Sequence, residues 1–347
     1  MKPANDTQAK DEIEAGVAAA RAGDESAFAR LVERHRRELQ VHCYRMLGSF
    51  DEAEDAVQET FLRAWRGREA FAGRSTFRAW LYRIATNTCL DALERRPRRP
   101  VLAGSPGGGS GAGDGGFEVP WLQPYPDRLL DGVAPPESEP DAVVAGKETI
   151  ELAFLVAIQH LPPRQRAVLI MRGILGWSTR ETAELLETTV ASVNSALQRA
   201  RATLRERLPA RRAEWAPEAE PTEAERVLLA RYVEATENAD SEAFIELMHE
   251  DARFAMPPEP EVWVGAETIV GAWRAGGFGT PDFGEMRCVT TRANRQPAVA
   301  CYVRKSGDDG PCRPLALDVL RIEEGRVAEI VTFPPDVFGV FELPPEL

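Results

Sequence analysis

A glycine-rich run divides the sequence into parts that cannot share one hydrophobic core. Eight of the fourteen residues from 103 to 116 are glycine, and six prolines follow between residues 120 and 140. This composition buries too little apolar surface to offset the conformational entropy lost on folding. We therefore interpret residues 97–146 as a flexible linker. A chain of 347 residues is long enough for two or three separate domains.

One stretch of this linker is apolar. Residues 121–126 read Trp-Leu-Gln-Pro-Tyr-Pro, and such side chains are poorly placed in a solvated linker. A chance apolar cluster is one interpretation. We favour the other, a docking segment that packs on a neighbouring domain. Its candidate docking residues are Trp121, Leu122, Pro124 and Tyr125.

Helical patterns lie on both sides of the linker. Residues 12–96 contain no proline and repeat apolar positions at spacings of three and four, so we expect an all-α domain. A second all-α domain is expected over residues 147–212. There, Ser178 and Glu181 predict a capping box at the start of one helix, and Thr189 predicts the N-cap of the next. Two helices joined by so short a turn indicate a helix-turn-helix.

The second helix of this pair has two different faces. Its inner face carries Val193, Leu197, Ala200 and Leu204. Short polar side chains near the start of the outer face suit contacts with base edges in a major groove, and the arginines that follow suit phosphates. An amphipathic helix with a solvated basic face would show a similar pattern. The candidate DNA-binding residues are Thr189, Ala191, Ser192, Asn194, Ser195, Gln198, Arg199, Arg201 and Arg205.

The last third of the chain changes from helical to strand patterning. After a short hinge at residues 213–221, residues 222–347 begin with two amphipathic helices and continue with alternating apolar segments, which indicates an α+β domain. The helices are expected at 223–236 and 241–248, and the strands at 252–256, 285–291, 298–304, 316–323 and 326–332.

The charge is distributed unevenly. Residues 1–214 carry 30 Lys and Arg against 30 Asp and Glu, whereas residues 215–347 carry 12 against 25, so the whole net charge of −13 lies in the last third. The acidic average therefore does not exclude nucleic-acid binding by the first two thirds.

The remaining composition excludes several classes of protein. The cysteines form no C-x-x-C pair and the four histidines are scattered, so we expect no disulfide framework, no metal and no cofactor, and we expect the cysteines to be small buried side chains. No apolar run is long enough for a signal peptide or a membrane span, which predicts a cytoplasmic protein without membrane contacts. The cysteines are Cys43, Cys89, Cys288, Cys301 and Cys312.

Two segments of the first helical region resemble extracytoplasmic-function sigma factors. Asp51–Trp65 is similar to the acidic and aromatic helix with which sigma factors grip the polymerase clamp. Phe77–Asp91 is similar to the helix that melts and reads the minus-ten element. The resemblance implies an RNA polymerase sigma factor that binds core RNA polymerase and promoter DNA.

The second helical region extends this resemblance. Leu161–Arg166 and Arg199–Arg205 are similar to the module that reads the minus-thirty-five element, and the matched parts follow one another in the family's order. Together they cover roughly residues 20–96 and 148–208. A one-component regulator, with a helix-turn-helix and a ligand-binding or enzymatic tail, is the alternative, but it needs neither a clamp helix nor a minus-ten helix.

Promoter opening requires side chains that capture unstacked bases, with cations beside them for the backbone. By the resemblance, the loop before the minus-ten helix captures a flipped base, and the helix continues that face. Core packing is the other explanation for its aromatic residues, and we expect Leu81 and Ile84 to be core. The candidate minus-ten residues are Phe71, Arg74, Ser75, Thr76, Phe77, Trp80, Arg83, Asn87, Arg95 and Arg96.

The clamp helix carries acidic residues in its first turn, which by themselves indicate only a favourable interaction with the helix dipole. Gln58, Leu62 and Trp65 on one helix suit a protein partner better than solvent. The candidate polymerase-binding residues are Asp51, Asp55, Gln58, Glu59, Leu62 and Trp65.

In the C-terminal region two helices precede the strands, Glu250–Phe254 follows the second helix, and Trp263–Trp273 leads into the expected sheet. This arrangement resembles the SnoaL-like group of cone-shaped α+β folds. The resemblance implies a domain that regulates the sigma factor in cis, through contacts with the linker and the sigma modules, in place of a separate anti-sigma protein. A cone-shaped fold of this kind has a pocket, for which a small molecule is the candidate ligand. Because neither paired carboxylates nor a nucleophile with its base can be identified, we expect ligand sensing or intramolecular docking and not catalysis. The candidate pocket residues are His249, Asp251, Trp263, Trp273 and Asp318.

Overall fold

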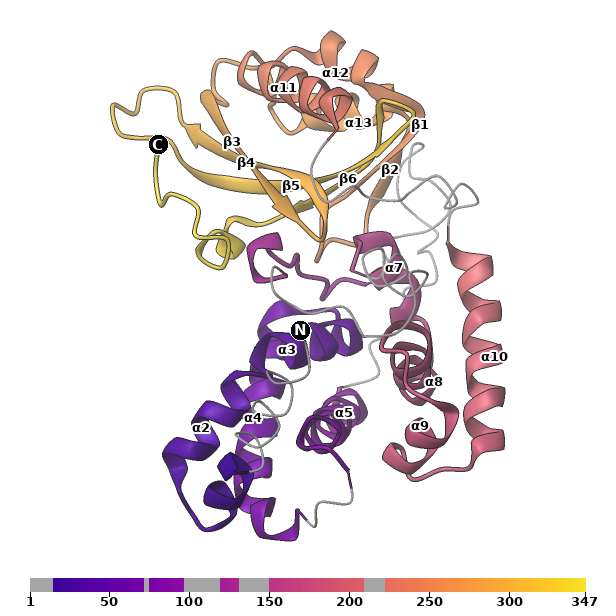
Figure 1. The fold of residues 1–347 in the computed structure, drawn as a ribbon. Coiled ribbons are helices and arrows are strands. Elements are labelled where there is room, and N and C mark those ends of the chain that lie inside the picture. The colour runs from indigo at the N-terminus through magenta and orange to yellow at the C-terminus, as the bar shows by residue number, and fades with distance from the viewer. Residues whose placement is uncertain (1–14, 72–74, 97–118, 131–149, 209–221) are drawn as a thin grey trace, which may run out of the picture. The chain divides into compact units, whose positions relative to one another are not determined.

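The computed structural model describes most of the chain as two compact units (Figure 1). The first contains residues 15–71, 75–96, 129–130 and 157–208. The second contains residues 119–128, 150–156 and 222–347. The glycine-rich run 103–116, the hinge 213–221 and Arg74 lie outside the described residues.

The first part of unit 1 is helical. Three of its helices begin at a residue whose side chain accepts a hydrogen bond from a backbone N–H, namely Asp24, Ser49 and Thr76. Gly48 ends another helix with a φ of 75°, a conformation that glycine adopts readily. The elements are α2 (Glu25–Glu33), α3 (Arg36–Leu47), α4 (Phe50–Gly67), the short 3-10 helix η1 (Arg68–Ala70) and α5 (Phe77–Arg95).

Helix α3 lies at the centre of this part. All of its residues from Leu39 to Leu47 are buried, because α4 and α5 both pack against it. Leu81 of α5 is fully buried, as expected, whereas Ile84 is only partly buried.

The second part of unit 1 contains the predicted helix-turn-helix. Ser178 and Glu181 form the expected capping box, and the Thr189 side chain accepts a hydrogen bond from the backbone N–H of Ser192. The four apolar residues predicted for the inner face of the last helix are all buried. The elements are the end of α7 (Leu152–Gln159), whose residues up to Val156 belong to unit 2, followed by α8 (Pro163–Leu169), the π-helical turn η3 (Ile170–Ile174), α9 (Thr179–Leu185) and α10 (Val190–Arg207).

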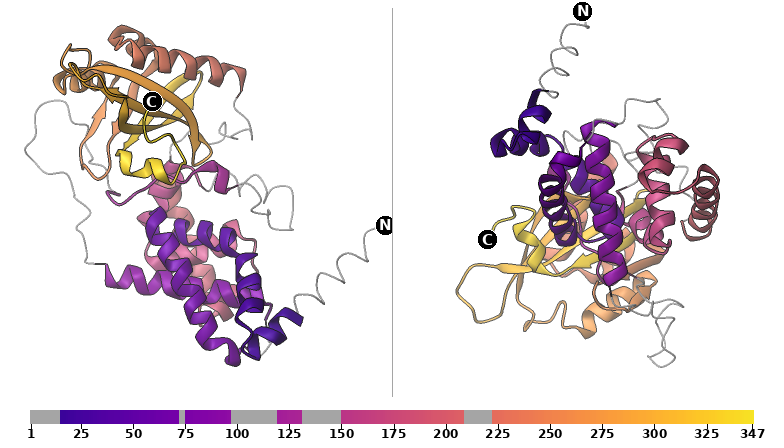
Figure 2. Two further views of the ribbon diagram at one scale, coloured as in Figure 1. Left: turned by 90° about the vertical axis from the view of Figure 1, so that its left-hand side faces the viewer. Right: turned by 90° about the horizontal axis from the view of Figure 1, so that it is seen from below.

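Unit 2 is a six-stranded mixed sheet covered by helices. The strand order is β2-β1-β6-β5-β4-β3, and only the pair β1 and β6 is parallel. Figures 1 and 2 show the helices α11 to α13 on one face of the strongly curved sheet. The helices are α11 (Glu223–Glu237), α12 (Ser241–Leu247) and α13 (Ala266–Ala275). The strands are β1 (Met248–Ala255), β2 (Val262–Val264), β3 (Glu285–Ala293), β4 (Gln296–Arg304), β5 (Arg313–Glu323) and β6 (Arg326–Phe333), and the 3-10 helix η5 (Pro335–Gly339) follows.

The structure corrects the expected elements of this unit in two places. Strand β1 starts at Met248 and not at 252, directly where α12 ends. Helix α13 and strand β2 were not predicted. Helix α13 lacks a side-chain N-cap and contains Ile269, Val270 and Gly271, which all have modest or low helix propensity, so it carries little local signal.

Aromatic side chains fill the space between the sheet and its helices. Phe244 contacts the rings of Tyr232, Trp273 and Phe278, and Trp273 also contacts Phe254. These residues belong to one continuous apolar cluster that spans both layers. The interior of the curved sheet is therefore packed with side chains.

Within the part of the chain that the structure describes, no helix has the length and hydropathy needed to cross a membrane. The same residues include no group of three or more His, Cys, Asp and Glu side chains that could hold a metal ion.

Candidate nucleic-acid and polymerase interfaces

The outer face of α10 is open to solvent along its whole length. All nine candidate DNA-binding residues, from Thr189 to Arg205, are exposed. The Thr189 hydroxyl group caps the helix, so it is already used locally. Short polar residues occupy the first two turns, and Arg199, Arg201 and Arg205 follow towards the C-terminal end. This arrangement places hydrogen-bonding groups ahead of cations on one helix face.

Val190, the first residue of α10, was not among the candidates although 48% of its surface is exposed. An exposed apolar side chain at the start of a recognition helix can contact the methyl group of thymine. The sequence pattern alone did not single it out, because a valine beside a helix cap more often faces the core.

The aromatic residues before and at the start of α5 form a cluster. Phe71 contacts Phe77 and Trp80 with ring centroids 5.9 and 5.0 Å apart, and Phe77 lies 5.6 Å from Trp80. Phe71 and Phe77 are buried, and Trp80 is partly buried. In this conformation Phe71 and Phe77 therefore act as packing residues and do not present their rings to an unstacked base.

The other candidate minus-ten residues divide into two groups. Ser75, Thr76, Asn87 and Arg95 are exposed, although the Thr76 hydroxyl group accepts the N–H of Ala79 as a helix cap. Arg96 instead bonds the carbonyl oxygen of Leu47 at 3.1 Å and pairs with Glu52. Arg96 thereby joins α5 to α3 and α4, a structural role that its position in the sequence did not indicate.

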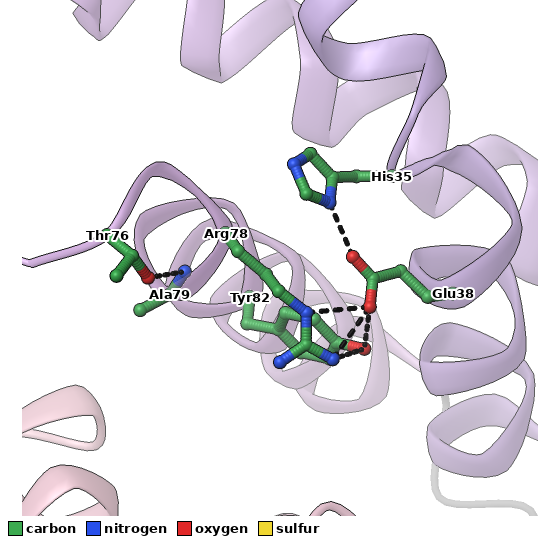
Figure 3. A network of polar contacts seen from close by, with 6 residues as sticks. All are labelled: His35, Glu38, Thr76, Arg78, Ala79 and Tyr82. Atoms are coloured by element: carbon green, nitrogen blue, oxygen red, sulfur yellow. Dashed lines mark hydrogen bonds and ion pairs between the residues drawn. The ribbon is translucent and has the colours of Figure 1, made fainter. Parts of the chain in front are cut away.

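A polar network that sequence reasoning missed fixes the orientation of α5 (Figure 3). Glu38 of α3 accepts hydrogen bonds from Arg78 at 2.8 Å and from Tyr82 at 3.2 Å, and His35 contacts its other oxygen. Burial opposes ionisation of Glu38, but the hydrogen bonds from His35 and Arg78 outweigh it and lower the pKa of this carboxyl group. Burial also raises the pKa of Tyr82, which keeps the phenol protonated as a donor.

This network has a consequence for the DNA-binding candidates. Because Arg78 and Tyr82 face α3, Arg83 and Asn87 lie on the exposed part of the same helix. Arg78 thus anchors α5, whereas Arg83 lies at the surface. The sequence alone does not distinguish these two arginines.

The candidate polymerase-binding residues of α4 also divide. Asp51, Asp55, Gln58 and Leu62 are exposed, and 50% of the Leu62 surface is accessible. Trp65 instead packs against Phe28, with ring centroids 5.2 Å apart. The exposed leucine among polar neighbours is the feature of α4 that a protein partner would bury.

Glu59 has a local partner. Its carboxylate accepts a hydrogen bond from Arg63 at 2.7 Å, and the same guanidinium bonds Asp91 of α5, also at 2.7 Å. The hydrogen bonds to Glu59 and Asp91 raise the pKa of Arg63. Glu59 therefore belongs to a bridge between α4 and α5.

A buried arginine joins the two parts of unit 1. Arg166 of α8 bonds the carbonyl oxygen of Met46, near the end of α3, and the side chain of Gln159, whose Nε2 in turn bonds the carbonyl oxygen of Arg45 at 3.2 Å. Two further bonds run from Arg166 to backbone oxygens of Gln159 and Leu161. Burial lowers the pKa of Arg166 to about 9. Arg166 lies at the C-terminal end of α3, where a cation interacts favourably with the helix dipole.

The same two parts meet at the surface of α5. Trp177 contacts the ring of Tyr82 with centroids 5.4 Å apart. Glu187, in the turn of the helix-turn-helix, pairs with Arg83. In this conformation a candidate minus-ten residue is therefore engaged by the module that carries the candidate minus-thirty-five residues.

Within unit 2, the apolar segment of the linker lies on the turn between β3 and β4. Leu122 and Tyr125 are buried, and so is Pro124, while Trp121 is partly buried. The backbone N–H of Tyr125 donates to Asn294 Oδ1 at 2.7 Å, and the Asn294 N–H donates to the Tyr125 carbonyl oxygen at 2.8 Å. Tyr125 is thus held by both the side chain and the backbone of one residue.

The same turn also holds the segment that leads into α7. Asn294 Nδ2 donates to the carbonyl oxygen of Ile150 at 2.6 Å, and Gln296 Oε1 accepts the N–H of Leu152 at 3.0 Å. Asp127 adds a charged contact, because it accepts hydrogen bonds from Arg292 at 3.0 Å and from the backbone of Arg295 at 2.7 Å. We call these contacts of residues 119–128 and 150–152 with the β3 to β4 turn the linker clamp.

The five candidate pocket residues have different surroundings. Asp318 is buried and accepts hydrogen bonds from Tyr232 at 2.9 Å and from Thr332 at 2.6 Å, while His249 bonds the carbonyl oxygen of Glu323 and Asp251 is exposed. Two surface depressions of about 460 and 470 Å³ are lined by other residues. Trp263 and Trp273 both pack on Phe254.

Comparison with protein families agrees with this arrangement. Residues 31–99 match the model for Sigma-70 region 2, residues 151–204 the model for Sigma-70, region 4, and residues 229–330 the model for the SnoaL-like domain. The first two matches contain α4 and α5 and the helix-turn-helix, and the third contains most of unit 2. We refer to these parts below as region 2, region 4 and the SnoaL-like domain.

Related proteins match the chain over most of its length. The ECF RNA polymerase sigma factor SigG of Mycobacterium tuberculosis is 43% identical over 339 residues, which cover 94% of this chain and 86% of that protein. SigW of Bacillus subtilis is 34% identical over 188 residues, which cover 54% of this chain and 91% of that protein. The crystal structure of the M. tuberculosis extracytoplasmic function sigma factor SigJ shares the fold, with a TM-score of 0.55 and 21% identity over 91% of this chain and 99% of that one. Because a relative this similar spans nearly the whole sequence, the chain belongs to the ECF RNA polymerase sigma factors.

Proposed function

We propose that the protein recognises promoter DNA for RNA polymerase through regions 2 and 4, and that its SnoaL-like domain regulates this step in cis by holding the linker between them. The linker clamp is the observation that carries the regulatory part of this proposal. Membership of the sigma family leaves the one-component regulator without support, because such a regulator has no use for region 2.

Promoter recognition is supported by the exposed face of α10. Its polar residues and arginines suit the minus-thirty-five element, and Asn87 and Arg95 of α5 suit the minus-ten strand. On α4, Gln58 and Leu62 suit the core polymerase.

The geometry of a promoter implies that unit 1 must open. The two promoter elements lie about 25 base pairs apart, or about 85 Å at about 3.4 Å per base pair. A compact unit of about 150 residues is only about 40 Å across. Regions 2 and 4 are packed together through Arg166 and through the contacts of Arg83 and Tyr82 with the helix-turn-helix. These contacts must break before each region can bind its own element.

The linker clamp is placed to influence that opening. The Asn294 side chain binds the backbone on both sides of the stretch 131–149, since Tyr125 precedes it and Ile150 follows it. Tyr125 and Ile150 are therefore both bonded to one turn of the SnoaL-like domain, and we infer that these bonds influence the separation of regions 2 and 4.

We propose that the SnoaL-like domain acts by docking and not by catalysis. Aromatic side chains fill its interior, and the partners of its buried carboxylate Asp318 are the hydroxyl groups of Tyr232 and Thr332 and the thiol of Cys301. This arrangement leaves the carboxylate surrounded by the protein's own donors.

A reconstituted transcription assay with core polymerase tests promoter recognition. Replacing Arg199 and Arg201 by Ala should weaken promoter binding and reduce the slope of log affinity against log salt by about 2, because two phosphate contacts are lost. The matched control is Arg226→Ala, which removes an exposed helical arginine from the SnoaL-like domain. An unchanged salt slope, or no initiation by the unmodified protein from any promoter, contradicts this part of the proposal.

The regulatory part is tested with Asn294→Gly in the same assay. Asn294 has a φ of 56°, which glycine adopts without strain, so the substitution removes the two side-chain contacts and keeps the turn. Transcript output at limiting polymerase should differ from that of the unmodified protein, whereas Asn238→Gly at the exposed end of α11 should leave it unchanged. Equal output from all three proteins refutes regulation through the clamp.

A further inference from the structure

We propose that Cys288 and Cys301 of the SnoaL-like domain are a reversible redox pair that hydrogen peroxide converts into an intramolecular disulfide. This inference is independent of the proposed function, because it rests only on the geometry and the chemistry of the two thiols.

The two cysteines face each other across neighbouring antiparallel strands. Cys288 of β3 is the direct partner of Cys301 of β4, and the two sulfur atoms lie 3.9 Å apart. They are separated by thirteen positions in the sequence, so no cysteine motif signals the pair. The register of the hairpin brings them together.

This pair occupies a non-hydrogen-bonded position of the ladder. The backbone N–H of Cys288 does not point to β4, since it donates to Glu237 Oε1 of α11 at 2.9 Å. The same alternation places Pro297, which has no N–H, opposite Arg292, four positions further along β3. Both observations indicate that Cys288 and Cys301 form a non-hydrogen-bonded pair.

The position suits a disulfide. At non-hydrogen-bonded sites of antiparallel strands the Cα atoms are about 4.5 Å apart. Disulfides accept Cα separations from about 4.4 to about 6.8 Å. The bond can therefore form by rotation of the two side chains, without separating the strands.

Of the two thiols, the more exposed one is expected to react first with peroxide. Cys288 is partly exposed, and the other four cysteines are buried. Reaction with a peroxide requires an accessible sulfur that can become a thiolate. Burial raises the pKa of Cys89, which disfavours the same reaction in region 2. Cys288 is thus the expected site of attack.

The reaction proceeds in two steps. The Cys288 thiolate attacks one oxygen of hydrogen peroxide, which breaks the O–O bond; the second oxygen leaves as hydroxide, takes up a proton and becomes water, and Cys288 becomes a sulfenic acid. Cys301 then attacks the Cys288 sulfur, the S–S bond forms, and the sulfenic oxygen leaves as a second water. In total, two thiols lose two electrons and two protons, and one peroxide becomes two waters. A small dithiol reverses the reaction by thiol–disulfide exchange.

The surroundings provide an acceptor for the proton of Cys301. Its sulfur lies 3.7 Å from Asp318 Oδ2, and this carboxylate is also bonded to Tyr232. The hydrogen bond with Cys288, burial and the neighbouring Asp318 charge raise the pKa of Cys301, so the thiol needs a base when it attacks. Burial raises the pKa of Asp318, which makes it a stronger base than an exposed carboxylate.

The test uses the full-length protein, reduced and then treated with hydrogen peroxide. After the remaining thiols are blocked with an alkylating reagent, peptide mapping should identify a disulfide between Cys288 and Cys301. The oxidised protein should take up two alkyl groups fewer than the reduced protein, and it should recover them after dithiothreitol. In the unalkylated protein the mass should fall by about 2 Da, the two hydrogens removed.

Two variants separate the pair from general oxidation. Cys301→Ser should leave Cys288 without a partner, so peroxide should drive it to the sulfinic acid, whereas Cys312→Ser, which removes another buried cysteine of unit 2, should preserve the disulfide. The inference is overturned if five alkylatable thiols remain after peroxide treatment, if the unmodified protein forms only a sulfinic acid at Cys288, or if the map shows a disulfide between other cysteines.

Discussion

Replacement of Asn294 by glycine should loosen the linker clamp by a predictable amount. The substitution removes one hydrogen bond from the Tyr125 N–H at 2.7 Å and one to the Ile150 carbonyl oxygen at 2.6 Å, both buried. A neutral hydrogen bond contributes about 1 kcal/mol net, so the loss amounts to about 2 kcal/mol. Since about 1.4 kcal/mol corresponds to a factor of ten, the clamp should open about 30 times more often.

Hydrogen exchange of the Tyr125 amide measures this opening directly, because that amide is itself a donor in the clamp. Its protection should fall about 30-fold, while the core amides of β4 and β6 keep theirs. In Asn238→Gly, the Tyr125 amide should exchange as in the unmodified protein. Unchanged protection of Tyr125 in Asn294→Gly would refute the reasoning, because it would mean that the side chain of Asn294 does not hold the linker.

Three further predictions concern unit 1. Burial is the main cause that lowers the pKa of His42 from 6.5 to about 3, so the stabilising contribution of the neutral imidazole is complete above pH 6.5. This contribution is lost as the pH falls towards 3, and the loss is about 2 kcal/mol at pH 5. Hydrogen exchange of α3 amides should therefore be less sensitive to acid in His42→Gln than in the control His249→Gln. Phe77→Ala should destabilise region 2 by about 3 to 4 kcal/mol in urea unfolding, because it leaves a cavity in the aromatic cluster; a loss below about 1 kcal/mol would contradict the packing role. Leu62→Asp should weaken binding to core polymerase at least about tenfold and change the free energy of unfolding by less than about 0.5 kcal/mol. Equal affinity of the variant and the unmodified protein for the polymerase would contradict the assignment of α4 as the contact surface.

Local signals in the sequence account for the helices of unit 1. Ser178 with Glu181, Thr189 and Gly48 act within one helical turn, so their capping roles could be predicted without knowledge of the fold. The polar outer face of α10 was also predictable, because burial of its apolar stripe leaves the opposite face exposed. Helix α13 has no such local signal, and it forms because its apolar residues pack on β1 and α12.

Only the tertiary structure distinguishes residues of the same type from one another. Arg166 is buried against helix carbonyl oxygens whereas Arg199 is exposed, and the difference depends on α3, which is more than a hundred positions away from Arg166. Phe77 became a core residue because Phe71 and Trp80 pack on it.

The linker clamp and the cysteine pair depend on strand register in the same way. The sequence was enough to identify the apolar segment at residues 121–126 and to predict two helical domains followed by an α+β domain. It could not place Asn294 beside Tyr125, 169 positions earlier, or Cys288 opposite Cys301. Both contacts follow from the pairing of β3 with β4, which is selected by burial of one sheet face and by the hairpin turn, and these are properties of the folded domain as a whole.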